Sequence, residues 1–170
     1  MIKFLNGFII FIMATLIHWL FIEIFSPFSV TVGVMFAFSL IVARLMPDLG
    51  GYTFAFLSGL FLDFFGNVMF GGYALVFTII IFIFYRVADK IDFKDTGPQI
   101  IITTFLNMSS VILYGLLGKI FTGSFLWQGL NSLLLGSFIT GLLLPVMYLA
   151  VTKYLTFGPV KKIHENKAIF

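Results

Sequence analysis

GYTFAFLSGLFLDFFG, residues 51–66, is an apolar stretch that keeps a single carboxylate, Asp63, near its end. Gly51, Ala55 and Gly59 precede this acid at intervals of four residues. Because an α-helix turns once in about 3.6 residues, the four positions share one helix face. Small residues at this spacing let two helix backbones approach closely in lipid. The stretch therefore predicts a membrane-crossing helix with a close-packing face that ends in a carboxylate.

The composition of the whole chain agrees with this interpretation. Of its 170 residues, 61% are hydrophobic and 10% are charged, and the mean hydropathy is +1.13. Soluble domains carry about 25% charged residues, so we expect an integral membrane protein. The absence of Cys excludes disulfides, Cys-ligated zinc and iron–sulfur clusters. His18 and His164 are far apart in sequence, and we expect no metal and no cofactor.

Six segments are apolar and long enough to predict transmembrane helices, which need roughly 20 residues each. The predicted fold is an all-α integral membrane protein with one six-helix domain over residues 1–157. Residues 158–170 form a short basic tail. The predicted helices cover about 4–25, 29–46, 49–66, 71–88, 98–120 and 128–157.

The basic residues divide unevenly between the two sides of such a membrane domain. If the six spans alternate, nine basic residues lie on one side, and only Lys119 lies on the other. Because cytoplasmic loops carry the excess of Lys and Arg, both termini are expected in the cytoplasm. The net charge of +3 comes from single membrane-flanking residues and the tail, so we expect no nucleic-acid partner.

Two interpretations of the small-residue face remain open, namely packing within this protein and packing against a partner. Asp63 is expected to face the bundle interior, because an acid facing lipid is costly. Its predicted partners are Lys119, Asn67, or the backbone amides of a helix start near Gly71 and Gly72. It serves either as a structural carboxylate between a loop and a helix end, or as an ion relay.

The remaining spans differ in character. Predicted spans five and six carry polar and small residues, including Asn107 and the four-apart series Ser132, Gly136 and Thr140. We expect these two spans to face inward or toward a partner. Spans one, two and four are rich in Phe and Ile, which predicts lipid-facing helices. His18 in span one is interpreted as a hydrogen-bonded packing residue. We find no catalytic motif and expect no enzyme.

Residues 27–88 resemble the MreD family of bacterial rod shape-determining membrane proteins. The pattern is Gly-x-x-x-(small)-x-x-(small)-Gly-Leu-x-x-Asp, a short loop, and Gly-x-x-Ala-Leu before an apolar helix that ends in a basic residue. Pro27, at the start of the second span, also fits the family. Phe70 and Tyr73 depart from it, where Leu and a smaller polar residue are common. The matching residues are Gly51, Gly59, Leu60, Asp63, Gly71, Ala74, Leu75 and Arg86.

This resemblance implies a fold similar to the substrate-binding subunits of energy-coupling-factor transporters. It also implies a multi-pass protein of the bacterial inner membrane that belongs to the cell-wall elongation complex. The implied partner is the bitopic protein MreC, and through it MreB, RodA and a class B penicillin-binding transpeptidase. The predicted function is a scaffold that captures the partner's membrane and juxtamembrane segments by helix packing. The predicted packing and contact residues are Gly51, Ala55, Gly59, Asp63 and Gly71.

Two other functions stay open. A solute-binding subunit of an energy-coupling-factor transporter would use the same fold to hold a small vitamin, and it needs an outer polar pocket. The polar residues expected there are Asp63, Asn67, Lys119 and Gln128. An ion or proton carrier would depend on Asp63 and Glu23, and it has few acids to use.

Overall fold

The computed structural model describes residues 2–47, 49–66, 69–88, 95–126 and 128–154. In these residues all the regular elements are helices, with no strand. The α-helices are α1 (Ile2–Phe25), α2 (Val34–Leu45), α3 (Leu49–Gly66), α4 (Gly72–Ala88), α5 (Thr96–Thr122) and α6 (Ser137–Tyr154). A 3-10 turn, Ser26–Phe28, follows α1, and a π-helical turn, Ser132–Gly136, leads into α6.

Four helical segments in the described part of the chain are long and apolar enough to cross a membrane. They are Leu5–Phe28, Leu49–Gly66, Thr96–Thr122 and Ser132–Tyr154. The other two apolar helices, α2 and α4, are shorter, with 12 and 17 residues. At 1.5 Å per residue, α2 is only about 18 Å long, whereas a bilayer core is about 30 Å thick.

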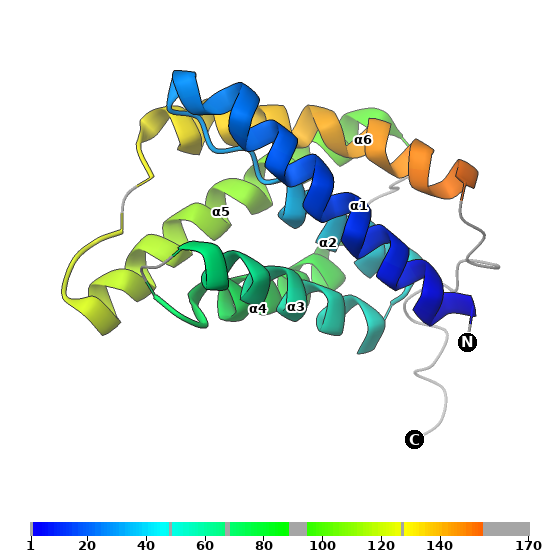
Figure 1. Ribbon diagram of the computed structural model, residues 1–170, viewed down its shortest axis with the longest axis horizontal. Coiled ribbons are helices and arrows are strands. Elements are labelled where there is room, and N and C mark those ends of the chain that lie inside the picture. Colours follow the sequence, from blue (N-terminus) through cyan, green and yellow to red (C-terminus); the bar gives the residue numbers. More distant parts are fainter. Residues whose placement is uncertain (1, 48, 67–68, 89–94, 127, 155–170) are drawn as a thin grey trace.

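Helix α2 lies at the centre of the molecule (Figure 1). Each residue from Val34 to Ala43 is buried, and α1, α3, α4, α5 and α6 all contact the helix. The prediction that span two faces lipid is therefore wrong. Its Phe and Ile side chains fill the space between the α3–α4 pair and the α5–α6 pair, so no face is left for lipid.

The predicted second helix, 29–46, begins at Val34 in the structure, five residues later than predicted. Ser29 has a positive φ of 52°, which is uncommon outside glycine. The amide of Thr31 donates to Ser132 Oγ at 3.0 Å, and the amide of Gly33 donates to Thr140 Oγ1 at 2.8 Å. Because hydroxyl groups of the last helical segment satisfy these amides, residues 29–33 need no helical hydrogen bonds.

The last predicted helix, 128–157, begins as the π-helical turn and ends at Tyr154 in the described chain. Its helical assignment continues through Pro145. Residues 155–157, the predicted tail 158–170 and the charged segment 89–94 lie outside the described residues.

Of the two orientations predicted for spans five and six, inward or toward a partner, the structure shows the inward one for most of their polar residues, whereas Ser109 and Asn131 are exposed. Asn107, Ser137 and Thr140 are buried, and Asn107 Nδ2 donates to Ser137 Oγ at 3.0 Å. Helix α1 crosses the bundle diagonally (Figure 1) and exposes most of its large apolar side chains, as predicted for a lipid-facing helix.

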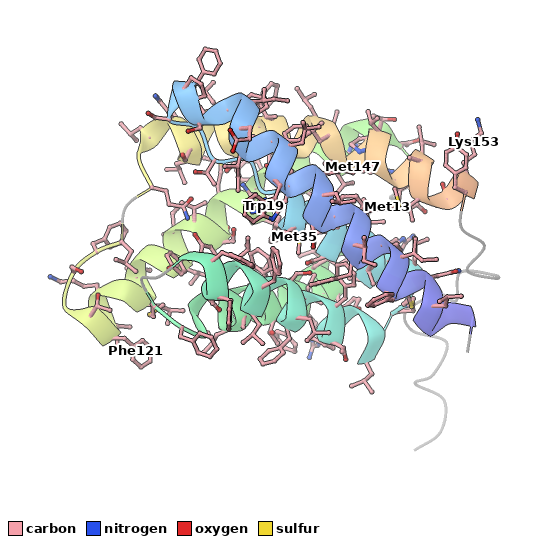
Figure 2. All side chains as sticks on the ribbon, in the orientation of Figure 1. Met13, Trp19, Met35, Phe121, Met147 and Lys153 are labelled. Atoms are coloured by element: carbon pink, nitrogen blue, oxygen red, sulfur yellow. The ribbon has the colours of Figure 1, made fainter. Side chains whose placement is uncertain are left out.

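The two ends of the molecule differ in charge. Helix α1 begins and α6 ends at the same side (Figure 1). Arg44, Arg86 and Lys153 lie in the last turns of α2, α4 and α6, whereas Lys119 lies in the last turn of α5. Figure 2 shows Phe121, near Lys119 in sequence, and Lys153 at opposite ends of the molecule.

Candidate functional site

The small-residue face of α3 packs against neighbouring helices of the same chain. Gly51, Ala55 and Gly59 are all buried. A Cβ atom at Gly59 would lie 2.5 Å from the backbone N and Cα of Ala74 in α4. A Cβ atom at Gly51 would collide with the Tyr85 hydroxyl and would lie 2.8 Å from the Cα of Ala43 in α2. The face therefore provides helix packing within the chain, and its contact with a partner stays a prediction.

Asp63 continues this face and binds the start of α4. Its Oδ1 accepts a hydrogen bond from the amide of Tyr73 at 2.8 Å, and its Oδ2 accepts one from the amide of Ala74 at 3.0 Å. Amides in the first turn of a helix have no acceptor within that helix, and a negative charge is favourable at this end. Of the three predicted partners of Asp63, the structure therefore shows the backbone amides at the start of a helix.

Gly71 occupies the position just before α4, where a side chain normally caps a helix. Its φ is +86°, a conformation that glycine adopts without steric cost. Its carbonyl accepts the amide of Leu75 at 3.0 Å. Gly71 has no side chain to reach the free amides, so Asp63 supplies from α3 the oxygen atoms of a cap residue.

Aromatic rings cover the region next to this cap. The rings of Tyr73 and Tyr114 are stacked, with centroids 4.0 Å apart and planes 13° apart. Gln128 Nε2 donates a hydrogen bond to the Tyr73 hydroxyl. Tyr114 was not predicted as part of the site, because no local signal relates it to Asp63, some 50 residues earlier in the chain.

The other predicted polar residues do not join Asp63. Lys119 is exposed, and its Nζ donates to the carbonyl of Gly123 at 3.1 Å. Asn67 lies outside the described residues, and Glu23 is exposed. His18 is buried, and its Nδ1 has no hydrogen-bond partner within the described part of the chain. No group of three or more His, Asp or Glu residues among the described residues could hold a metal ion.

An apolar groove, which the sequence does not predict, lies along α3 beside the first part of α1. We call it the α1–α3 groove; its volume is about 680 Å³. Nine residues of α3 line it, three residues near the start of α1 line one side, and two residues near the end of α2 lie between them. The lining residues are Gly7, Phe8, Phe11, Val42, Met46, Leu49, Gly50, Thr53, Phe54, Leu57, Leu60, Phe61, Phe64 and Phe65.

A smaller and more polar pocket of about 350 Å³ lies beside the non-helical segment 29–33. Its polar lining consists of Ser26, Ser29, Thr31, Gln128 and Ser132, and Phe21, Ile22, Val30 and Val32 complete it. Of the residues predicted for an outer polar pocket, Gln128 lines this one, and Asp63 and Lys119 do not.

Comparison with known proteins does not place this chain in a family. No family model, no curated protein and no solved structure matches it.

Proposed function

We propose that this protein is a non-enzymatic, six-span scaffold of the bacterial cell-wall elongation complex, similar in role to MreD. It holds the membrane-spanning and juxtamembrane parts of an MreC-like bitopic protein. Through that protein it is linked to MreB filaments, RodA and a class B penicillin-binding transpeptidase.

The observation that carries this proposal is the convergence of the residues behind the sequence resemblance. Gly59, Asp63, Gly71 and Ala74 meet at the contact between α3 and the start of α4. Gly51 makes the close contact at the other end of the same face. These residues determine how closely two helices approach and where α4 begins. Residues that fix the packing of two helices in this way suit a scaffold protein.

A six-span topology is compatible with the short helix α2. The 12 residues of α2 account for about 18 Å. Residues 29–33 add less than the about 16 Å of five fully extended residues, because Ser29 is left-handed and the amide of Val34 bonds the carbonyl of Val32. A bilayer core of about 30 Å leaves about 12 Å for them to cover. The irregular backbone is tolerated at this depth because Ser132 and Thr140 satisfy its amides.

The proposed orientation has both termini in the cytoplasm. It rests on Arg44, Arg86 and Lys153 at the ends of α2, α4 and α6, opposite Lys119 at the end of α5. In this orientation the Asp63 cap belongs to the outer half of the membrane.

The first experiment is gentle purification of the tagged protein from native membranes, followed by intact-mass identification of what accompanies it. We expect a single-span, coiled-coil protein with a domain outside the cytoplasm. An ATPase-linked membrane module, or no protein partner at all, would overturn the scaffold proposal.

The polar pocket beside residues 29–33 favours a second candidate function, a solute-binding subunit of an energy-coupling-factor transporter. Its hydroxyl and amide groups, from Ser26, Thr31 and Gln128 among others, suit a small neutral solute. The same intact-mass measurement tests this function, because a retained small molecule would add its mass to the protein. Loss of that added mass in the variant Gln128→Leu, but not in Lys119→Leu, would support a ligand in this pocket.

A further inference from the structure

The polar pocket beside residues 29–33 lies where three irregular pieces of backbone meet. The 3-10 turn Ser26–Phe28, the non-helical residues 29–33 and the π-helical turn Ser132–Gly136 each contribute to its lining, together with the end of α1. Figure 1 shows the end of α1 and the start of the last helical segment at the same end of the molecule. Because π-helical turns often accompany functional sites, and because a volume of about 350 Å³ suits a small ligand, this pocket is a candidate binding site.

The buried hydroxyl group of Ser132 lines this pocket, and its proton lacks a well-placed acceptor. Ser132 is 1% exposed, and its Oγ accepts a hydrogen bond from the amide of Thr31 at 3.0 Å. The two oxygens that could accept its own proton, Ser29 O and Thr31 Oγ1, lie 3.4 and 3.3 Å away. Hydrogen bonds between hydroxyl and oxygen prefer about 2.7–2.8 Å. A ligand oxygen in the pocket would therefore accept this proton at a better distance.

Other hydroxyl groups of the lining also keep hydrogen-bonding capacity for a ligand. Within the described part of the chain, the side-chain hydroxyls of Ser26 and Ser29 make no hydrogen bond. The Thr31 hydroxyl accepts the long contact from Ser132 and donates to no described residue. Because a hydroxyl group both donates and accepts, this wall matches ligand groups that also do both.

The amide side chain of Gln128, which also lines the pocket, is held in place by the rest of the bundle. Its Nε2 donates a hydrogen bond to the hydroxyl of Tyr73. The ring of Tyr73 stacks on Tyr114 with centroids 4.0 Å apart, and its amide donates to Asp63 at 2.8 Å. Gln128 Oε1 makes no hydrogen bond within the described residues. It therefore offers an acceptor that is already ordered, and ordering in advance lowers the entropic cost of binding.

The rest of the lining is apolar and uncharged. It consists of Phe21, Ile22, Val30 and Val32, and the ring of Phe21 stacks on that of Phe25, with centroids 5.6 Å apart. No charged side chain among the described residues lines the pocket. A charged ligand would lose its hydration there without gaining a counter-charge, and an entirely apolar ligand would leave the hydroxyl groups without partners. The lining therefore favours a neutral molecule that has both an apolar surface and several hydroxyl groups.

A sugar ring combines these two properties, because its hydroxyl groups lie around the edge and its C–H groups form apolar faces. We propose that the polar pocket beside residues 29–33 binds a sugar ring, carried either by a free sugar or by the head group of an uncharged glycolipid. This proposal rests on the second candidate function only for the pocket, whose ligand class it names. It requires neither an ATPase-linked module nor a transport step.

Native mass spectrometry of the purified full chain tests this site with both sources of the sugar. The free sugars are glucose, galactose and mannose, and the glycolipid is monoglucosyl diacylglycerol. The detergent is an alkyl amine oxide, because a glucoside or maltoside detergent would itself present a sugar ring. We expect a saturable adduct with at least one of these probes. An adduct with a free sugar assigns a soluble ligand, whereas an adduct with the glycolipid alone assigns a lipid head group.

Two threonine variants show whether the sugar binds in this pocket. Thr31 and Thr53 are both exposed, but Thr31 lines the pocket, whereas Thr53 does not and bonds Leu49 O of its own helix at 2.8 Å. We expect Thr31→Val to weaken binding about two- to tenfold, which corresponds to one neutral hydrogen bond, and Thr53→Val to leave binding unchanged. Gln128→Leu, which removes the ordered acceptor, is the second variant in case Thr31→Val does not fold.

The sugar site would be refuted if the folded chain formed no adduct with any of these probes. It would also be refuted if the pocket variants bound the sugar as well as Thr53→Val does. Because the measurement uses the isolated chain, failure of the site is distinguishable from failure of either function. A chain that brings an ATPase-linked module from native membranes but binds no sugar would keep the transporter function and refute the ligand class. A chain that binds sugar without such a module would keep the site and refute the transporter function.

Discussion

At the scale of single residues, two positions, Gly71 and Asp63, together form the N-terminal cap of α4. Gly71 has a φ of +86°, a backbone conformation that residues with a side chain rarely adopt. Asp63 then supplies the acceptors from another helix, at 2.8 and 3.0 Å from the amides of Tyr73 and Ala74. Because the oxygen atoms come from α3, the cap also ties the two helices together. Asp63 therefore has a structural role that requires no proton transfer.

Removal of this cap should destabilise the protein. In Asp63→Ala the two amides lose their acceptors, and loss of a helix cap costs about 0.5–2 kcal/mol. We expect a lower melting temperature, measured in detergent by circular dichroism. Glu23→Ala is the control, because Glu23 is exposed on α1. Equal melting temperatures for the two variants would show that the cap contributes nothing to stability.

Two glycines of α3 should differ in their response to an added methyl group. In Gly59→Ala the new Cβ would lie 2.5 Å from the backbone of Ala74. Such overpacking lowers the free energy of unfolding by about 1–3 kcal/mol. In Gly66→Ala the Cβ would meet no atom within 4 Å. Thermal unfolding should show a clear loss of stability for the first variant and little change for the second. A Gly59→Ala variant as stable as the original chain would mean that α3 and α4 are not in close contact.

At the scale of elements, residues 29–33 and the last helical segment depend on each other. Gly136 lets the two approach, because a Cβ there would collide with the carbonyl oxygen of Thr31. Ser132 and Thr140 lie four residues before and after Gly136. Their hydroxyl oxygens accept hydrogen bonds from the amides of Thr31 and Gly33, respectively. The series Ser132, Gly136 and Thr140 therefore packs a non-helical segment and not another helix.

Loss of one hydroxyl from this series should loosen the segment. Thr140→Val keeps the side-chain shape but leaves the part-buried amide of Gly33 without its acceptor, which costs up to about 1–3 kcal/mol. We expect faster amide hydrogen exchange over residues 29–33, measured by mass spectrometry, and a lower melting temperature. Thr78→Val is the control, since the Thr78 hydroxyl bonds Ala74 O of its own helix, at 2.7 Å. Similar exchange in both variants would contradict the role of Thr140.

At the scale of the whole molecule, the proposed topology requires the end of α6 and the loop after α5 to lie on opposite sides of the membrane. Lys153 and Phe121 mark these two ends (Figure 2). The positive charges at the ends of α2, α4 and α6 favour a cytoplasmic location for the end that Lys153 marks.

The natural absence of Cys allows a direct test of this topology. Single cysteines are introduced as Lys153→Cys and Ser124→Cys and labelled with a membrane-impermeant maleimide. We expect Ser124→Cys to react when the reagent is added outside intact cells, and Lys153→Cys to react only in inverted vesicles. Labelling of both variants from the same side would rule out the alternation of spans that the proposal needs.

Much of the candidate site could be predicted from α3 alone. Helical periodicity places Gly51, Ala55, Gly59 and Asp63 on one face, and the cost of an acid in lipid predicts that this face is buried. The choice of partner for Asp63 could not be made, because a lysine, an amide side chain and a helix start all satisfy a carboxylate. Tyr114 was beyond prediction as a neighbour of Tyr73, since it follows Tyr73 by more than 40 residues.

The sequence by itself determined that the chain is helical and apolar enough for a membrane, and which residues of each helix share a face, because these properties depend on composition and on residues within a few turns. Only the tertiary structure decided that α2 is the buried centre, that residues 29–33 are not helical, and that α1 and α3 form a groove. Lipid and a protein interior are equally apolar, so hydropathy does not distinguish the side chains of α2 from those of α1. The acceptors of the Thr31 and Gly33 amides lie more than 100 residues away, where no local pattern can reveal them.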